Sequence, residues 1–574
     1  MLEIGTTTRG GRIVLSDDER ARHIQIVGSI GTGKSKLLEH MVRQDIARGR
    51  GLCLVDPHGT LADEIERWCA LRGFGNIRRI HLIRPGDSMH VPGFNPLRTV
   101  PGEALSVRVD AMVAACAQAW GVRDMADTPR LDKILHALFY VLAARGLTLA
   151  EGPALLQARD PEGIRRLLTE TLPDPVYQLT WDELNGMPRR EFAEHVESTI
   201  TRLSKFLTTP AIRLVVGQKE HTIDFRSAMD RGEIVIVNLG ARQAFSYSNA
   251  RLLGMLLIND LFLTALGRDK KTALARPFTL YLDEAYDFLS WDIERILDQT
   301  RKFGLHAVLA HQRIGQLKER GEGIYSAVMG GTQTKIVLGG LSDDDAAIMA
   351  REIMRGDIDL ERPKRGITAP VVIGEEPFWL ESESQSEGFS TASATTHSSS
   401  ASDMNSESSG TSTLFSGAAG EPLEQRGATE ISVGMSGRTT SEGVATTESE
   451  SRSESRTSGR SQVLRSIREE RPTHFYSLEE SLHLAQLKLR NLPDRTAIVK
   501  RRGKRTVRID MIEVRDVIDA PRIVERFRTA ISSKSAYVSD ISAAEAEILA
   551  RQSALVSPVK AKSKPGDDDF WHEE

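Results

Sequence analysis

The sequence predicts an α/β protein built on a mainly parallel sheet, and two observations support this prediction. Short apolar runs rich in Val, Ile and Leu recur along the first two thirds of the chain, with helical patterns between them. Most of these runs are apolar throughout rather than alternating, which is typical of strands that helices cover on both faces. The predicted strands are 23–27, 51–56, 79–83, 233–239, 278–284, 306–311 and 335–339.

Length and composition limit the kind of protein this is. A chain of 574 residues exceeds a single hydrophobic core, so several domains are expected. The net charge of -4 excludes a uniformly basic nucleic-acid-binding protein and confines any such contact to a local patch. Cys53, Cys69 and Cys116 form no metal-spaced pair and are expected to be buried thiols in a reducing compartment.

The strand pattern is interrupted once. Residues 101–225 show only helical spacing, which predicts an all-α subdomain inserted between two parts of the core, 1–100 and 226–380. The apolar stretch 252–266 is too short to span a membrane and contains Asn259 and Asp260, so it predicts a buried helix. No signal peptide precedes the core. We therefore expect no membrane span, and a cytoplasmic protein or one that a partner holds at a membrane.

Composition changes sharply near residue 381. Residues 381–464 are rich in Ser, Thr, Gly and Glu, which predicts a disordered linker or long loop. Order returns in 465–553, where Ser477 and Glu480 form a capping box ahead of a helix. A hairpin and two further helices follow, and this segment is expected to complete the core in part. The last residues, 554–574, predict a disordered tail.

A glycine-rich loop lies between the first predicted strand and a helix. Its sequence, GSIGTGKS, fits GxxxxGK[ST], in which glycines let backbone N–H groups turn toward phosphate oxygens. Lys34 is expected to contact the β- and γ-phosphates of ATP, and the Ser35 hydroxyl to coordinate Mg²⁺. The predicted ATP-binding residues are Gly28, Ser29, Ile30, Gly31, Thr32, Gly33, Lys34 and Ser35.

A second acidic motif follows the strand 278–284. Its apolar residues deliver Asp283 and Glu284 to the carboxyl edge of the sheet, where ligand sites of α/β proteins lie. Asp283 is the expected Mg²⁺ partner, and Glu284 the expected base that polarises the attacking water. Gln312, after the next strand, could sense the γ-phosphate or simply end the strand. Arg301 could stabilise a helix end or reach a neighbouring subunit's ATP.

Two further features leave both a structural and a functional interpretation. His58 and Asp63 suggest a metal site, but no second histidine has suitable spacing, and structural roles are favoured. The run 500–505 is the densest basic stretch and could contact DNA phosphates or form a solvated hairpin tip.

Taken together, GSIGTGKS, LVDPHGTLADEI, FNPL, LYLDEAYDFL, TRKFGLHAVLAHQ and GTQTKIVLG resemble the FtsK–HerA superfamily of P-loop motors. Within it the sequence is most similar to conjugative type IV secretion coupling proteins and HerA-like relatives. The resemblance covers residues 20–375, and more weakly 477–500. It implies a RecA-like core and a hexameric ring that pumps DNA. It also implies ATP bound between subunits, with Arg301 supplied by the neighbour.

The resulting functional prediction is an ATP-hydrolysing ring motor that uses Mg²⁺ and translocates DNA without sequence preference, because phosphate contacts carry no sequence information. A nuclease, relaxase or membrane protein is the expected partner. The alternative is a secretion or assembly ATPase that acts on protein partners instead of DNA.

Overall fold

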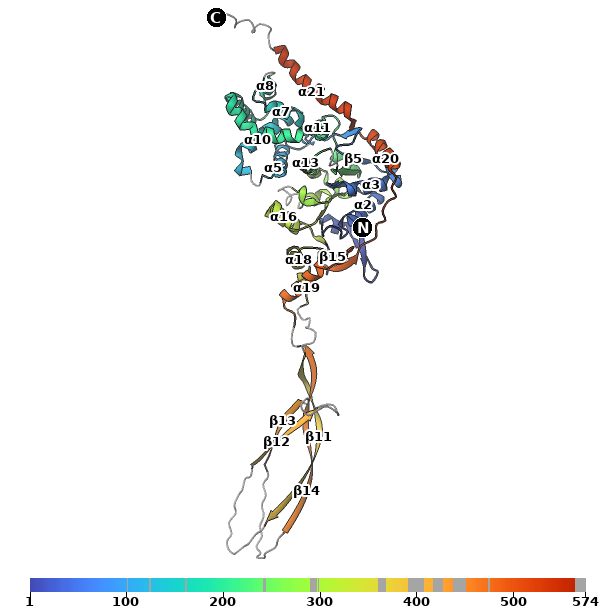
Figure 1. Cartoon of the computed structure of the whole chain (residues 1–574), viewed down its shortest axis with the longest axis vertical. Coiled ribbons are helices and arrows are strands. Elements are labelled where there is room, and N and C mark those ends of the chain that lie inside the picture. Colours follow the sequence, from blue (N-terminus) through green and yellow to red (C-terminus); the bar gives the residue numbers. More distant parts are fainter. Residues whose placement is uncertain are drawn as a thin grey trace. The chain divides into compact units, whose positions relative to one another are not determined.

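The computed structural model describes all residues except 101, 123–124, 161–162, 241–243, 290–296, 298, 360–367, 391–406, 417–426, 437–450, 473–474 and 563–574. It divides into two compact units (Figure 1). Unit 1 comprises Met1–Arg362 and Tyr476–Glu574, and unit 2 comprises Pro363–Phe475. Each unit is described by itself.

Unit 1 is built on an 11-stranded sheet in the order β2-β1-β16-β15-β10-β3-β9-β8-β4-β7-β5. The strands from β10 to β5 are all parallel to one another and match the seven predicted strands. The predicted α/β fold with a mainly parallel sheet is therefore confirmed. These seven are β3 (Ile24–Val27), β4 (Gly51–Asp56), β5 (Ile80–Ile83), β7 (Ile234–Asn238), β8 (Phe278–Leu282), β9 (Leu305–His311) and β10 (Thr334–Leu338).

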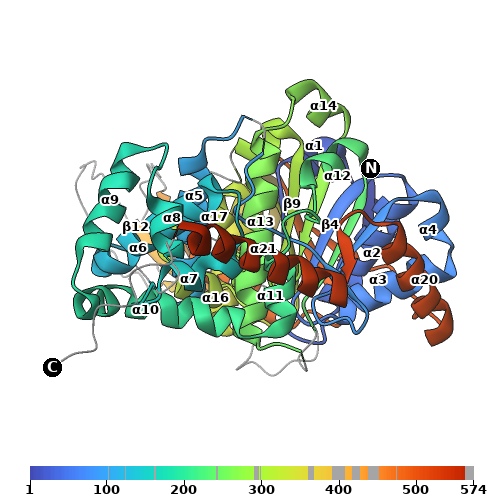
Figure 2. The same cartoon turned by 90° about the horizontal axis from the view of Figure 1, so that it is seen from above.

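The parallel strands are buried on both faces, which explains their uninterrupted apolar sequences. Along β4, Leu52 and Leu54 join one hydrophobic cluster, whereas Cys53 and Val55 join the other. Figure 2 shows the sheet between α13 on one side and α2, α3 and α20 on the other. The helices on these faces are α2 (Lys34–Ala47), α3 (Thr60–Leu71), α20 (Pro521–Lys534), α12 (Phe225–Arg231), α13 (Tyr247–Leu266) and α17 (Glu322–Gly331).

The inserted region between β6 (His90–Pro92) and β7 consists of helices, which pack on α13 from the side away from the sheet. Its core includes the buried Trp181, whose indole N–H donates to the Ala137 carbonyl oxygen at 3.1 Å. Its main helices are α5 (Leu105–Ala119), α6 (Pro129–Ala144), α7 (Gly152–Leu155), α8 (Ile164–Thr169), α9 (Pro175–Gly186), α10 (Arg189–Leu207) and α11 (Pro210–Val216).

Helix α13 contains the apolar stretch that was predicted to be a core helix. By length and composition it is the one helix in the described part of the chain that could cross a membrane. In unit 1 it is 72% buried. Burial on this scale inside the protein is that of a core helix between a sheet and a helical layer.

Four antiparallel strands extend the parallel sheet at one side. The predicted hairpin at 495–512 is present as β15 (Thr496–Arg501) and β16 (Val507–Asp510), with Gly503 in its turn at φ 68°. The hairpin β1 (Leu2–Thr7) and β2 (Arg12–Leu15) was not predicted. Its turn, TTTRGG, carries a Gly-Gly pair that marks such hairpins and could have revealed it.

The C-terminal region returns to unit 1 as predicted, with one difference in extent. Helix α19 (Leu478–Arg490) begins with the predicted capping box of Ser477 and Glu480. The predicted tail at 554–574 is wrong in its first part, because α21 (Ile541–Lys562) continues to Lys562. Alanine, the residue with the highest helix propensity, is the most frequent residue of that helix. The rest of the predicted tail lies outside the described residues.

Unit 2 contains two antiparallel strand pairs, β11 (Thr368–Ser390) with β14 (Ser451–Pro472) and β12 (Glu407–Ser416) with β13 (Gly427–Ser436). Most of this unit is the Ser-, Thr-, Gly- and Glu-rich segment 381–464, which was predicted to be a disordered linker or long loop. Ser and Thr tolerate extended backbone, and two strands can pair without a core. Val371, Val372 and Trp379 are exposed, as expected for a segment too polar to build one. The intervening residues, also predicted to be disordered, lie outside the described ones.

Candidate nucleotide-binding site

The glycine-rich loop connects β3 to α2 at the carboxyl edge of the sheet. Gly31 and Gly33 have φ of 86° and 106°, in the left-handed region that glycine adopts without strain. Gly33 is the N-cap of α2, so no side chain caps the helix, and its first turn has no acidic residue. The first N–H groups of α2 are thus available to an anion such as a phosphate.

The neighbouring chain segments hold this loop in place. The Ser29 N–H donates to the Gly339 carbonyl oxygen at 3.3 Å, and the Ser29 hydroxyl donates to the Gly340 carbonyl oxygen. On the other side, the Arg495 N–H donates to the Thr32 carbonyl oxygen at 3.1 Å. The loop is therefore fixed before any ligand binds, which lowers the entropic cost of binding.

Lys34 and Ser35 connect the loop to the acidic motif after β8. The Lys34 side chain is 6% exposed, and its Nζ lies 2.6 Å from Glu284 Oε1. The Ser35 hydroxyl lies 3.5 Å from Asp283 Oδ2. Residues predicted from two separate motifs thus meet at one place, because the carboxyl ends of parallel strands share one edge.

Glu284 has an unusual conformation for an acidic residue. Its φ is 51°, in the left-handed region, and strain of this kind accumulates at functional sites. Oε1 accepts hydrogen bonds from Lys34 Nζ and, at 2.8 Å, from Gln312 Nε2. Oε2 is buried and has no partner within the described residues. An unsatisfied buried carboxylate oxygen is placed to accept a proton or a hydrogen bond from a bound water.

Asp283 is buried among other charged groups. Burial is the main cause that raises the pKa of Asp283 to about 6. The nearby carboxylates Asp56 and Glu284 also raise this pKa, whereas Lys34 lowers it. A divalent cation at this position would offset the clustered negative charge. Carboxylate and hydroxyl oxygens are ligands that Mg²⁺ prefers, so Asp283 and Ser35 fit a magnesium site.

Of the two polar residues that end β9, only Gln312 reaches the site. Strand β9 lies between β3 and β8, which places Gln312 between the loop and Glu284. His311 is fully buried on the other side, where its Nε2 lies 3.0 Å from Gln25 Nε2. Burial lowers its pKa to about 4, so the imidazole is neutral at physiological pH.

Arg301 lies at the opposite edge of the sheet, in a helical turn (Arg301–Phe303) just before β9 begins. Its guanidinium is 44% exposed and lies 3.6 Å from the Asp18 carboxylate. The structure therefore does not bring Arg301 to the glycine-rich loop of its own chain. From this position Arg301 can act on another molecule but not on the glycine-rich loop of its own chain, or it has no functional role.

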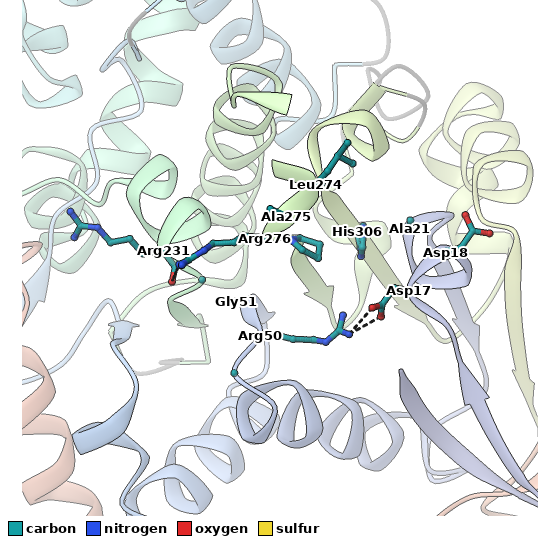
Figure 3. Close-up of a pocket in the computed structure, with 14 residues that line it drawn as sticks. Asp17, Asp18, Ala21, Arg50, Gly51, Arg231, Leu274, Ala275, Arg276 and His306 are labelled. Atoms are coloured by element: carbon teal, nitrogen blue, oxygen red, sulfur yellow. Dashed lines mark hydrogen bonds and ion pairs between the residues drawn. The ribbon is translucent and has the colours of Figure 1, made fainter. Parts of the chain in front are cut away.

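A cavity of about 720 Å³ opens at this amino edge, away from the glycine-rich loop (Figure 3). Arg50, Arg231 and Arg276 line it, and Arg50 donates to both Asp17 carboxylate oxygens at 2.7 and 2.9 Å. His306 lines it too, and burial lowers the pKa of this imidazole to about 3. Three arginines and two aspartates, Asp17 and Asp18, thus line the cavity.

The sequence left open whether His58 and Asp63 form a metal site or have structural roles, and their surroundings favour structural roles. Asp56 accepts hydrogen bonds from the N–H groups of His58 at 2.8 Å and Ala62 at 2.9 Å, which fixes the start of α3. Asp63 pairs with Arg84 at 2.7 Å and Arg528 at 3.0 Å. The described residues contain no group of three or more His, Cys, Asp or Glu side chains that could hold a metal.

The basic run 500–505 is partly neutralised within the chain. Lys500 pairs with Asp357 at 3.0 Å, and Lys504 pairs with Glu19 at 2.9 Å. These contacts within unit 1 neutralise part of the charge of the hairpin tip and weaken its interpretation as a DNA contact.

One ion pair near Glu284 was missed by sequence reasoning. Asp287 is 2% exposed, accepts a hydrogen bond from the Tyr247 hydroxyl and lies 3.1 Å from Arg320 Nη2. It anchors the turn after Glu284 to α13 and α16 (Gly315–Arg320). No spacing in the sequence relates these three residues, which come from separate elements.

The fold and the site together have the parts of a P-loop nucleoside triphosphatase. Residues 277–362 match the family model described as "TraM recognition site of TraD and TraG". The resemblance to conjugative coupling proteins is thus confirmed over this segment, which contains β8, β9 and β10. No curated protein sequence matches the chain.

Several solved structures are similar in fold. "Bacterial conjugative coupling protein TrwBdeltaN70. Unbound monoclinic form" has 14% identity over 90% of this chain and 91% of that chain, with a TM-score of 0.49. "Plasmid coupling protein TrwB in complex with the non-hydrolisable ATP-analogue ADPNP" has 16% identity, the same coverage and a TM-score of 0.49. VirB4 of Thermoanaerobacter pseudethanolicus has 14% identity over 62% of this chain and 88% of that chain, with a TM-score of 0.42.

Proposed function

We propose that this protein is an ATP-hydrolysing ring motor that translocates DNA, similar to conjugative coupling proteins. The observation that carries the proposal is the convergence of Lys34, Glu284 and Gln312 within hydrogen-bond distance at the carboxyl edge of the sheet. A phosphate-binding loop alone indicates binding, whereas a buried carboxylate beside it supports hydrolysis.

The residues of the site suggest an order of events. The N–H groups of the loop and of the α2 N-terminus would hold the phosphates of ATP. An entering phosphate would compete with Glu284 for Lys34 Nζ, because both are anions that bind the same ammonium group. Glu284, once released from Lys34, would polarise the attacking water, while the Gln312 amide holds the carboxylate in position. Mg²⁺, held by Ser35 and Asp283, would neutralise phosphate charge.

The proposal includes a ring of identical subunits, with six as the expected number. The glycine-rich loop and Arg301 lie at opposite edges of one sheet, so Arg301 can serve an ATP site only in a neighbouring copy. Head-to-tail packing of such copies closes into a ring when the rotation between them allows it. Arg301 would then stabilise the charge of the transition state in the next subunit.

We further propose that the ring acts in the cytoplasm on the DNA phosphate backbone, without sequence preference. The family description names a recognition site for a protein, which supports a contact between residues 277–362 and a partner in DNA processing, such as a relaxase or nuclease complex. Membrane association would come from a partner protein.

The second candidate is a secretion or assembly ATPase that acts on proteins. The protein-recognition description of residues 277–362 is the observation that favours it. The two candidates share the ATP site and differ in what stimulates it.

The test is the steady-state ATPase rate of the purified protein with and without long duplex DNA of random sequence. We expect DNA to stimulate the rate, and Glu284→Gln to reduce it by about 10²- to 10⁴-fold with nucleotide binding retained. The protein-directed ATPase would be favoured by a different result. In that case Glu284→Gln abolishes the ATPase rate, but neither single- nor double-stranded DNA changes it.

A further inference from the structure

We infer that Arg495, from the last quarter of the chain, is a nucleotide-binding residue whose guanidinium contacts the phosphate chain held by the glycine-rich loop. This inference rests on the proposed function in one respect, that the loop binds a nucleoside triphosphate. Arg495 follows Lys34 by 461 positions in the sequence, so it reaches the loop only through the fold.

The backbone of Arg495 is held against the loop in a strained conformation. Its φ is 58°, in the left-handed region, and only two other non-glycine residues in the described part of the chain share this feature. Its N–H donates to the Thr32 carbonyl oxygen at 3.1 Å, and its carbonyl oxygen accepts from the Met511 N–H at 2.8 Å. One of the other two residues is Glu284, the proposed base. Strain of this kind is retained where the side chain has a function.

The side chain of Arg495 runs beside the start of α2. A Cβ atom added to Gly33 would lie 3.8 Å from Arg495 Cγ, so the stem of the arginine passes the residue that caps the phosphate-binding helix. The guanidinium is 62% exposed, and its ion pair with Glu513 is long, at 3.4 Å, and also exposed. An exposed pair of this type contributes little, so a polyphosphate can replace Glu513 as the partner.

The neighbouring cation on α2 is engaged elsewhere, which singles out Arg495. Lys36 lies 2.7 Å from Asp516 and 2.9 Å from Glu39, and these two carboxylates neutralise it. Among the described residues beside the loop, and apart from the buried Lys34, Arg495 is thus the cation that is held only by a weak ion pair. A phosphate can replace Glu513 as its partner.

The test compares nucleotide affinity in Arg495→Asn, Arg495→Lys and the parent protein, using a fluorescent ATP analogue with Mg²⁺. Asparagine tolerates the left-handed conformation, so this variant keeps the backbone contact with Thr32. We expect about tenfold weaker binding for Arg495→Asn, a smaller loss for Arg495→Lys, and an unfolding temperature without nucleotide that is equal to or above that of the parent.

Two controls separate the possible outcomes. Arg502→Asn, on the same hairpin but away from the loop, should bind nucleotide as the parent does, and Lys34→Ala should lose binding. If Arg495→Asn and Arg495→Gly both bind within twofold of the parent while Lys34→Ala does not, the inference is overturned and the proposed function stands. If the parent itself binds no nucleotide, both are overturned.

Discussion

The two edges of the parallel sheet differ in how their charged groups are used. At the carboxyl edge, Lys34, Glu284 and Gln312 contact one another, and Asp283 lies beside them. At the amino edge, Arg276 and Arg301 come from separate connections around an open cavity and contact only carbonyl oxygens or surface carboxylates. At the carboxyl edge the charged groups of one chain therefore converge on one place, whereas at the amino edge Arg301 is 44% exposed and makes a surface ion pair.

This difference indicates a division of work between copies of the chain. The carboxyl edge gathers carboxylates and would gain the charge of a triphosphate, while the amino edge is basic. Opposite charges on opposite edges favour the head-to-tail packing that we propose for the ring. The following predictions test that division, from the largest expected effect to the smallest.

The largest effect is expected from Arg301→Ala. If Arg301 stabilises the transition state in a neighbouring subunit, its removal should lower the maximal ATPase rate by about 10³-fold and leave nucleotide binding unchanged. Steady-state hydrolysis and binding of a fluorescent ATP analogue measure the two quantities separately.

Mixing two inactive variants distinguishes a neighbour's site from the chain's own. In a mixture of Arg301→Ala with Lys34→Ala, some interfaces join an intact loop to an intact Arg301, so part of the activity should return. No recovery, with mixed assemblies shown to form, would contradict a role for Arg301 in the next subunit.

An intermediate effect is expected at the carboxyl edge from Asp283→Asn. Burial raises the pKa of Asp283 to about 6 in the folded chain, above the ordinary value of an aspartate, so its ionisation opposes folding as the pH rises through this range. Removing the charge should stabilise the nucleotide-free protein at pH 7.5 by up to about 3 kcal/mol. The gain should shrink as the pH falls below 6 and vanish below about pH 3, where the parent carboxyl is protonated in both the folded and the unfolded state.

Thermal unfolding in the presence of a chelator at the two pH values measures this gain. Asn retains the size of Asp and an oxygen that can accept from Ser35. An Asp283→Asn protein that unfolds at or below the parent temperature at pH 7.5 would show that the carboxylate is not destabilising.

The smallest effect is expected at the amino edge from Asp18→Asn. The ion pair between Asp18 and Arg301 is exposed at 3.6 Å, and such pairs contribute at most about 1 kcal/mol. The unfolding temperature should therefore stay the same, and the ATPase rate should change by less than about twofold. A large loss of activity would mean that Asp18 positions Arg301 for its role. Because Asp18→Asn breaks the same ion pair but keeps Arg301, this variant is the matched control for Arg301→Ala.

The parallel part of the sheet was predictable because its strands are buried on both faces. A strand such as 234–238 consists of Ile, Val, Ile, Val and Asn, and its burial leaves no polar face to obscure the pattern. The antiparallel hairpin β1–β2 was missed because it is short and only partly buried. Residues 381–464 gave no strand prediction because Ser, Thr, Gly and Glu dominate their composition.

The carboxyl-edge site was predictable because its residues follow strands that end at a common edge. Motifs in the sequence placed Lys34, Asp283, Glu284 and Gln312, and the fold brings them together. The cations of the amino edge and Arg495 follow no motif. Their positions depend on long-range pairing, which periodicity within one segment does not encode.

The pairing of β1 with β16 also determines when the sheet can be completed during synthesis of the chain. Thr6 lies opposite Asp510, so the first strand leaves the ribosome long before its neighbour exists. At typical rates of synthesis this wait is on the order of 25 to 100 s. During that time the first strand exposes an unpaired edge, and the glycine-rich loop lacks the contact with Arg495. The glycine-rich loop therefore gains this contact only when the last quarter of the chain has been made.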